Sequence, residues 1–181
     1  MADTITALIL GDIVGQPGCR ALFVGLKGLI KKYNADFVVV NGENAAGGFG
    51  LTPDLADQIF GNGVDVITSG NHIWQKREIL KYLDVTERLL RPANYPTDVP
   101  GKGYCVVSKK EFRLGVINLQ GRVRMYDLES PFDAAQSIVR SLNEQTDGIV
   151  VDFHAEETGE KEALALYLDG KVNAVVGTHT H

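Results

Sequence analysis

GYCVVSKKEFRLGVINL, residues 103–119, is the stretch that decides the fold class of this chain. It holds two strand patterns, 103–109 and 112–119, joined around residues 109–111 with no helix between them. Strands joined this closely indicate an antiparallel hairpin. Elsewhere, short runs rich in Val and Ile alternate with longer amphipathic segments, which is typical of a parallel sheet covered by helices. A hairpin within such an α/β chain predicts a second sheet, and therefore a sandwich of two sheets flanked by helices.

Hydrophobic periodicity predicts the other elements. Apolar runs indicate strands at 5–11, 36–41, 64–69, 148–153 and 172–177. Helical spacing indicates helices at 18–33, 53–61, 76–83, 132–144 and 159–168. We expect these five strands to lie in one largely parallel sheet, with the hairpin in the second sheet. The Pro- and Gly-rich stretch RPANYPTDVPGKG, residues 91–103, is expected to be a surface loop.

Composition limits the classes of function. The 181 residues, 44% of them hydrophobic, suit one domain with a layered core. A net charge of -5 gives no basic footprint for duplex nucleic acid, although bound cations could still attract a small anionic substrate. The first residues show neither a signal peptide nor a membrane span. Cys19 and Cys105 are too few for a disulfide framework, and reduced thiols indicate the cytoplasm.

All four histidines lie at the carboxyl ends of predicted strands. They occur in SGNH, VVDFH and AVVGTHTH, as His72, His154, His179 and His181. Ligand sites of open α/β sheets form just beyond these ends, where loops converge, and histidine is the commonest metal ligand. Asp12 and the pair Glu43 and Asn44 add oxygen donors at two further strand ends. The pattern predicts a metal centre built from several loops.

GTHTH, residues 177–181, is the strongest local signal. In an extended segment alternate residues share a face, so His179 and His181 can point into one pocket while Thr178 and Thr180 point away. On a helix the same spacing would place the two rings about 200° apart. The alternative, two polar residues on a solvated strand end, is disfavoured by the equivalent positions of the other histidines.

GNH, residues 70–72, follows the strand predicted at 64–69. Gly70 would let the backbone approach the cleft, Asn71 offers a carbonyl oxygen to a cation, and His72 offers a titratable imidazole. The alternative is an ordinary turn, for which Gly-Asn is a common dipeptide.

GEN places a carboxylate beside an amide, at Glu43 and Asn44. Adjacent strand side chains diverge, so both can serve one centre only if the backbone turns, which Gly42 permits. Glu43 could then bridge two cations through its two oxygens, while Asn44 could instead have a capping or turn role. AAGGFG, residues 45–50, lacks the order of a phosphate-binding loop and is interpreted as a flexible wall of the pocket.

Two aspartates have competing interpretations. Asp12, in GDIVG, is either an oxygen ligand or the N-cap of the next helix, which is the commoner role for an isolated Asp in this position. Asp152 shares a strand face with His154, so it is interpreted as a partner that orients the ring rather than as a ligand.

The number of donors predicts how many metals are bound. Seven nitrogen or oxygen donors are too many for a closed four-ligand site, namely Asp12, Glu43, Asn44, Asn71, His154, His179 and His181. With Glu43 shared, they divide into two groups of four, each with room for water. This arrangement fits a two-metal hydrolase in which a metal-bound hydroxide attacks.

The order of these motifs resembles that of calcineurin-like metallophosphoesterases, whose patterns are D-x-H, GD-x-x-D, GNH, H and GH-x-H. This chain differs in two places, because Val14 stands where the first motif has His and Glu43-Asn44 replaces the usual bridging Asp region. These differences match the YmdB-type subfamily, which all 181 residues resemble. The stretches that carry the resemblance are GDIVGQPG, NGENAAGGFG, GNH, RPANYP, NLQGRV, VDFHAE and GTHTH.

The resemblance implies a four-layer α/β/β/α sandwich, with residues 1–181 as a single metallophosphoesterase domain lacking the C-terminal strands that follow GTHTH in the subfamily. It implies one metal site formed by Asp12, Glu43, Asn44 and His181. It implies a second metal site formed by Glu43, Asn71, His154 and His179. In the subfamily the Asn of GEN replaces the missing His, and His72 would be the general acid that protonates the leaving oxygen.

The implied activity is hydrolysis of phosphodiesters, with 2',3'-cyclic nucleotides as the expected substrates. The cofactors would be two divalent or trivalent ions, iron or manganese first and magnesium or zinc as alternatives. Two other functions stay open, a phosphomonoesterase and a metal-binding regulatory protein with little turnover. The expected partner is the small substrate, without duplex nucleic acid or membrane, and a homo-oligomer is compatible with the sequence.

Overall fold

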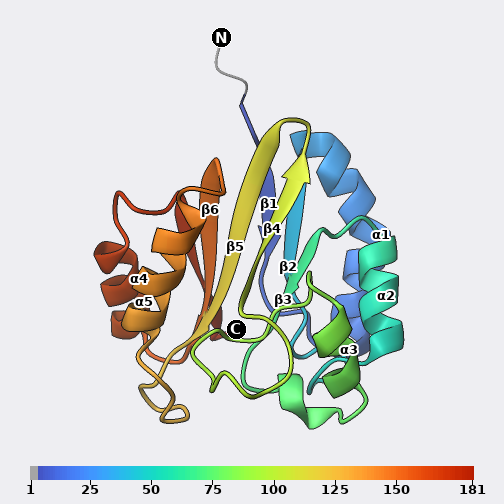
Figure 1. The fold of residues 1–181 in the computed structure, drawn as a ribbon. Coiled ribbons are helices and arrows are strands. Elements are labelled where there is room, and N and C mark those ends of the chain that lie inside the picture. Colours follow the sequence, from blue (N-terminus) through green and yellow to red (C-terminus); the bar gives the residue numbers. More distant parts are fainter. Residues whose placement is uncertain (1–3) are drawn as a thin grey trace.

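The computed structural model describes residues 4–181 and has four layers, with helices on the outside and two sheets between them (Figure 1). The first sheet contains β1 (Ala7–Leu10), β2 (Phe37–Asn41) and β3 (Val66–Thr68), all parallel and in that spatial order. Its outer face is covered by α1 (Gly15–Tyr33), α2 (Pro53–Gly61) and α3 (Ile79–Val85). A short 3-10 helix, η1 (Ile73–Gln75), precedes α3.

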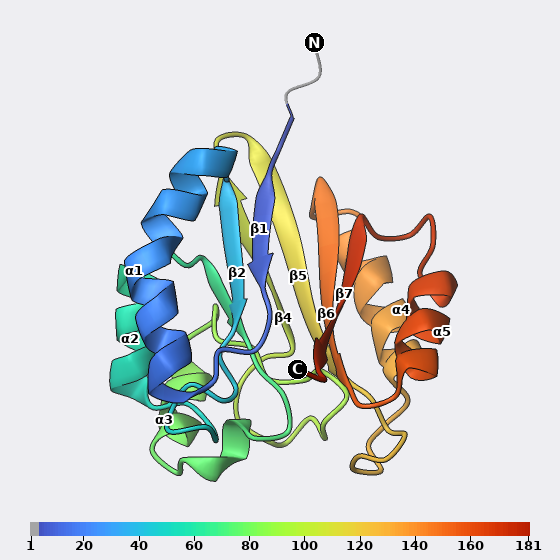
Figure 2. The ribbon, with the colours of Figure 1, turned by 180° about the vertical axis from the view of Figure 1, so that it is seen from behind.

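The second sheet has the order β4-β5-β6-β7, and its strands are β4 (Tyr104–Lys109), β5 (Phe112–Gln120), β6 (Gly148–Ala155) and β7 (Ala174–His179). The β4–β5 pair is antiparallel, which confirms the hairpin predicted from the sequence, and the other pairs are parallel. Helices α4 (Pro131–Leu142) and α5 (Thr158–Tyr167) cover its outer face, as Figure 2 shows from behind. The four-layer sandwich is therefore confirmed.

The predicted division of strands between the sheets was wrong for 148–153 and 172–177. Both were expected beside β1 and β2, but β6 pairs with β5 and β7 pairs with β6 in the second sheet. A crossover through a helix returns the chain beside the strand that it left. Because β6 is reached from β5 through α4, it extends the sheet that the hairpin began.

Alternate side chains of each strand pack on opposite faces of its sheet, so some meet between the two sheets and others pack against the helices. Side chains of Val39, Val66, Val116 and Val150 meet between the two sheets. Their sequence neighbours on the second sheet pack against α4 and α5 instead. Every residue of β2 is buried, because helices cover one of its faces and the second sheet covers the other. Polar side chains at the inward positions of these strands are therefore enclosed.

The stretch 91–103, expected to be a surface loop, is buried in its first half. Arg91 is only 6% exposed and Asn94 is fully buried. The backbone N–H of Ala93 donates to the carbonyl oxygen of Asn118 on β5 at 2.7 Å, so this segment packs along the end of the second sheet. Its Pro and Gly content indicated irregular backbone correctly but did not indicate exposure.

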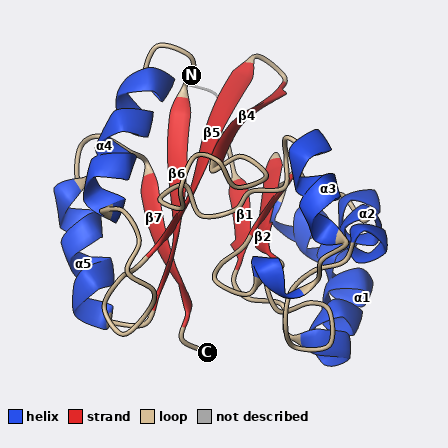
Figure 3. Ribbon diagram, turned by 60° about the horizontal axis from the view of Figure 1, so that its bottom comes forward, coloured by secondary structure: helices blue, strands red, loops and turns tan. Residues whose placement is uncertain are grey.

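The carboxyl ends of the parallel strands of both sheets point to the same edge of the sandwich, where the chain also ends at His181 (Figure 3). The predicted ligand loops are gathered along this edge. Within the described residues, no helix is both long and apolar enough to cross a membrane.

Candidate metal centre

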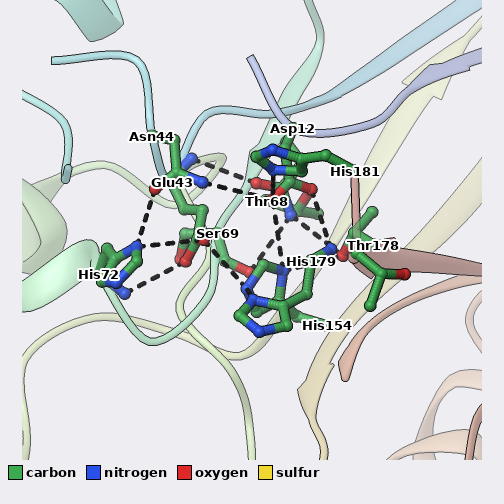
Figure 4. Close-up of polar contacts among 12 residues, drawn as sticks. Asp12, Glu43, Asn44, Thr68, Ser69, His72, His154, Thr178, His179 and His181 are labelled. Carbon is green, nitrogen blue, oxygen red and sulfur yellow. Dashed lines mark hydrogen bonds and ion pairs between the residues drawn. The ribbon is translucent and has the colours of Figure 1, made fainter. Parts of the chain in front are cut away.

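Six of the seven residues predicted to bind metal, all except Asn71, are seen together where the two sheets meet at their carboxyl edge (Figure 4). They form two groups. We call Glu43, Asn71, His154 and His179 the inner group. We call Asp12, Asn44 and His181 the outer group. Sequence reasoning assigned Glu43 to both groups, and it is counted with the inner group because it contacts His154.

Three members of the inner group present ligand atoms to one point. Glu43, His154 and His179 each offer an atom within 4.8 Å of the other two. Glu43 Oε1 lies 3.0 Å from His154 Nε2, which lies 3.1 Å from His179 Nδ1. His179 has a φ of 88°, a backbone conformation rare for residues other than glycine and concentrated at functional sites. Two imidazole nitrogens and a carboxylate facing one another form a typical set of metal ligands.

Glu43 and His154 shift each other's pKa in the inner group. Burial favours the neutral forms of Glu43 and His154, but their mutual pairing outweighs it, so the pKa of Glu43 is lowered and that of His154 is raised. Burial, followed by the nearby His154, lowers the pKa of His179. Binding a cation at this point would require the ring nitrogens that face it to be deprotonated.

A buried relay holds the ring of His154. Thr178 Oγ1 donates to Asp152 Oδ1 at 2.7 Å and lies 3.0 Å from His154 Nδ1. A threonine hydroxyl has one hydrogen, so Nδ1–H of the histidine must donate to it. This leaves Nε2 directed at Glu43 and His179. Asp152 therefore orients the ring as the sequence suggested, but through Thr178.

Asp152 also joins the two sheets. It accepts hydrogen bonds from Asn41 Nδ2 at 3.0 Å and from the hydroxyl of Thr68, both on the first sheet. Burial raises the pKa of Asp152, and the donors from Thr68 and Thr178 act against that rise. The network fixes the position of β6 relative to the first sheet directly beneath the inner group.

Gly70 shapes the inner group by having no side chain. A Cβ placed there would overlap with His154 Cδ2 and Glu43 Oε2. The following residue, Asn71, has a buried Oδ1 without a hydrogen-bond donor among residues 4–181. An unpartnered buried acceptor that follows Gly70, beside a carboxylate whose near neighbours are imidazole nitrogens, fits a bound cation.

The contacts of the outer group centre on Asp12. Asp12 Oδ1 accepts the backbone N–H of His179 at 3.2 Å, and Oδ2 lies 3.3 Å from His181 Nε2. Asn44 directs Nδ2 to Asp12 Oδ2 at 3.5 Å, so binding a cation there would require its amide to turn over. The alternative role of Asp12 as a helix cap is wrong, because α1 starts after Val14 without a side-chain cap.

His72 lies beside both groups but within neither. Its Nδ1 is 2.8 Å from Asn44 Oδ1 and 3.4 Å from Glu43 Oε1, and its backbone N–H donates to Glu43 Oε2 at 3.1 Å. The ring packs edge-on against Phe49 at 5.0 Å, so the glycine-rich stretch 45–50 does form a wall around it. The side chain keeps 24% of its surface exposed, which leaves it accessible to a bound ligand.

Sequence reasoning missed the polar residues behind the site. Thr178 was expected to point away from the pocket, yet it is buried and bonded to His154. Asn41, Asn118 and Gln120 are fully buried as well. The signal available in the sequence was polarity at inward positions of otherwise apolar strands, as in FVVVN and GVINLQ.

The fold and site together define a class of protein. Two sheets flanked by helices, with histidines and carboxylates at their common edge, form the fold of calcineurin-like metallophosphoesterases. A solved putative 5'-nucleotidase from Staphylococcus aureus shares this fold at a TM-score of 0.66 and 19% sequence identity, covering 88% of this chain and 39% of that chain.

The chain belongs to the YmdB-like protein family, whose model matches residues 8–181. It is 45% identical over 174 residues to a 2',3'-cyclic-nucleotide 2'-phosphodiesterase of Bacillus subtilis, an alignment that covers 96% of this chain and 66% of that relative. The crystal structure of a phosphatase from Mycoplasma pneumoniae matches with a TM-score of 0.92 and 34% identity, over 100% of this chain and 66% of that chain. The chain thus spans slightly less than two thirds of the length of these two proteins.

Proposed function

We propose that the intact protein is a metal-dependent phosphodiesterase that acts on small phosphodiesters, with 2',3'-cyclic nucleotides as the substrate class. The observation that carries this proposal is that Glu43, His154 and His179 present ligand atoms within 4.8 Å of one another, together with the unpartnered buried Oδ1 of Asn71. The name of the Bacillus subtilis relative supports the choice of substrate.

We assign the ligands as the resemblance implies. Glu43, Asn71, His154 and His179 would hold one ion. Asp12, Asn44 and His181 would hold the other, with Glu43 shared between the two. Bound metal ions would supply activation of water and stabilisation of charge on the phosphoryl group. The resemblance implies iron or manganese, with zinc or magnesium as alternatives, and a mixture of imidazole and carboxylate donors is compatible with these ions.

The chain itself would supply the proton. Nδ1 of His72 faces Asn44 and Glu43, and it would still face the Asn44 amide after that amide turned over. This leaves Nε2 as the atom that can give a proton to the departing oxygen. Water adds to phosphorus and releases one proton to solvent, one P–O bond to the ribose breaks, and the ribose oxygen leaves with the proton from His72, which is then reprotonated from solvent. Phe49 and Asn44 restrict the orientation of the ring, which is what proton transfer in a fixed geometry requires.

The experiment compares substrates in the intact, metal-loaded protein. We expect turnover of 2',3'-cyclic AMP and of bis(p-nitrophenyl) phosphate, little turnover of p-nitrophenyl phosphate, and loss of activity on chelation. A preference for the monoester would make the protein a phosphomonoesterase. Stable metal binding without turnover of any ester would make it a regulatory metal-binding protein and would refute the proposed activity.

His72→Ala tests the proton donor. The variant should keep both metals yet lose about 100- to 10,000-fold in rate on the cyclic nucleotide. The loss should be smaller on bis(p-nitrophenyl) phosphate, because nitrophenolate leaves without a proton. If His72→Ala loses metal, or slows both substrates equally, the general-acid role is wrong.

A further inference from the structure

Gln120 is a buried side chain at the metal centre that the proposed chemistry has not used. It is the last residue of β5 and is fully buried. Its Oε1 accepts a hydrogen bond from the hydroxyl of Tyr95 at 3.2 Å. Its Nε2 is buried and has no acceptor in the described part of the chain. The amide oxygen of Gln120 is therefore hydrogen-bonded, and the amide nitrogen is a donor without an acceptor in the described residues.

Strand alternation shows which way Gln120 faces. Asn118, two residues earlier on β5, pairs with the backbone of Ser69, accepting its N–H at 2.9 Å and donating to its carbonyl oxygen at 3.0 Å. Residues two apart on a strand share a face, so Gln120 also faces the first sheet, where the chain continues from Ser69 into Gly70 and Asn71.

The neighbouring strand places Gln120 beside a proposed ligand. Gln120 and His154 are register partners in the parallel β5–β6 pair, so their side chains lie next to each other on the same face. Gln120 thus lies beside His154 of the inner group, on the face of β5 that is turned toward the segment that runs from Ser69 into Gly70 and Asn71.

The RPANYP segment holds Gln120 in this position. Asn94 forms two hydrogen bonds with the backbone of Gln120. Asn94 Oδ1 accepts the N–H of Gln120 at 2.9 Å, and Asn94 Nδ2 donates to the carbonyl oxygen of Gln120 at 2.8 Å. Tyr95 holds the side chain and packs edge-on against Trp74, at 5.1 Å between ring centroids. Trp74 belongs to η1, directly after His72. This support fixes the amide before any ligand binds.

We propose that Gln120 is a substrate-binding residue whose Nε2 donates a hydrogen bond to a phosphoryl oxygen held at the inner group. The inference rests on the proposed function. The polar atoms of this edge are complementary, since the Glu43 carboxylate and the unpartnered Oδ1 of Asn71 suit cations while the unpartnered Nε2 of Gln120 suits an anionic oxygen. A phosphate group bound to metal is the ligand that satisfies both kinds at once.

The test uses inorganic phosphate as the probe, so that it does not depend on turnover. Phosphate binding to the intact, metal-loaded protein is measured by calorimetry for the wild type, Gln120→Met and Gln120→Glu, with metal content determined for each. Gln120→Met keeps the length of the side chain and removes the donor. Gln120→Glu keeps the shape and replaces the free donor with an anionic acceptor. Gln145→Met, at an exposed glutamine after α4, is the matched control.

We expect both variants to keep their metals. Gln120→Met should weaken phosphate binding about 10- to 100-fold, the usual effect of losing a hydrogen bond to a charged group. Gln120→Glu should weaken it further, because its carboxylate repels the anion. Gln145→Met should bind as the wild type does. Tyr95→Phe should weaken phosphate binding less than Gln120→Met, because it frees the amide without removing it.

Three results would overturn the inference. Loss of metal in Gln120→Met would show that the amide supports Asn71 or His154. Phosphate binding by Gln120→Glu as tight as that of the wild type would show that the free end of the amide does not face an anion. Unchanged phosphate binding in Gln120→Met, in a folded and metal-loaded protein, would show that the amide is structural. Failure of the proposed function is distinguished from these results, because it would appear as absent turnover in the wild type.

Discussion

The inner and outer groups of the metal centre contain similar ligands but are supported differently. Glu43 and His154 are fully buried at the ends of paired strands, and a relay through Thr178 to Asp152 holds His154. In the outer group, the side chain of His181 is 52% exposed, and its ring pairs with Asp12 at 3.3 Å. The inner group is ordered by the fold itself, whereas the outer group is shaped by loops. We therefore expect the inner group to bind its ion more tightly.

Glu43→Gln should have the largest effect, because the shared carboxylate would lose charge toward both groups. We expect the affinity for both ions to fall by more than about 100-fold. Residues that only hydrogen-bond to a metal ligand change the affinity by about 10- to 100-fold, and Glu43 would itself be a ligand. The measurement is metal content and affinity of the intact protein. Loss of one ion alone would show that Glu43 belongs to a single group.

Gly70→Ala should affect the inner group selectively. The new methyl group would occupy the space of His154 Cδ2 and Glu43 Oε2, so these side chains must shift. We expect loss of the inner ion, with a fall in the free energy of unfolding of about 1–3 kcal/mol from overpacking. Metal analysis and chemical denaturation of the intact protein measure the two effects.

Gly11→Ala is the matched control for Gly70→Ala, because a Cβ at Gly11 meets nothing within 4 Å. It should leave metal binding and stability near those of the wild type. Equal effects of the two substitutions would contradict the claim that the inner group is closely packed around Gly70.

Thr178→Val should weaken the inner group without removing a ligand. The substitution keeps the shape of the side chain but breaks the link between His154 and Asp152. We expect the affinity of the inner ion to fall about 10- to 100-fold, while the outer ion is retained. Titration of metal into the apoprotein measures the two affinities separately.

Thr180→Val provides the comparison for Thr178→Val. Thr180 lies two residues further along the chain, and its hydroxyl accepts a hydrogen bond from Lys161 at the exposed surface. No change in either affinity is expected. A similar loss in both variants would mean that the GTHTH segment matters as a whole and that the relay has no separate role.

His181→Ala should have the smallest effect. The ring of His181 is 52% exposed, so water can take its place as a ligand, and we expect the affinity of the outer ion to fall by about 10-fold or less, with the inner ion unchanged. The same metal titration measures this loss. A larger loss of affinity than that caused by Thr178→Val would contradict the prediction that His181→Ala has the smaller effect.

Much of the site was predictable because strand ends are visible in the sequence. Each of Asp12, Glu43, Asn71 and His154 follows or ends an apolar run, and the parallel topology of α/β chains brings such ends to one edge. The hairpin at 103–119 was equally clear, since two strand patterns with no helix between them permit few other structures.

Tertiary structure alone decided which strands share a sheet and which polar residues are buried. β6 and β7 read as ordinary parallel strands, and only their pairing with β5 places His154 opposite Glu43. Thr178 and Gln120 gave no strong local signal, because burial of a polar side chain depends on partners far along the chain. The periodicity of a sequence determines which faces are apolar, but the contacts between faces come from packing two sheets together, and those contacts orient His154 and Gln120.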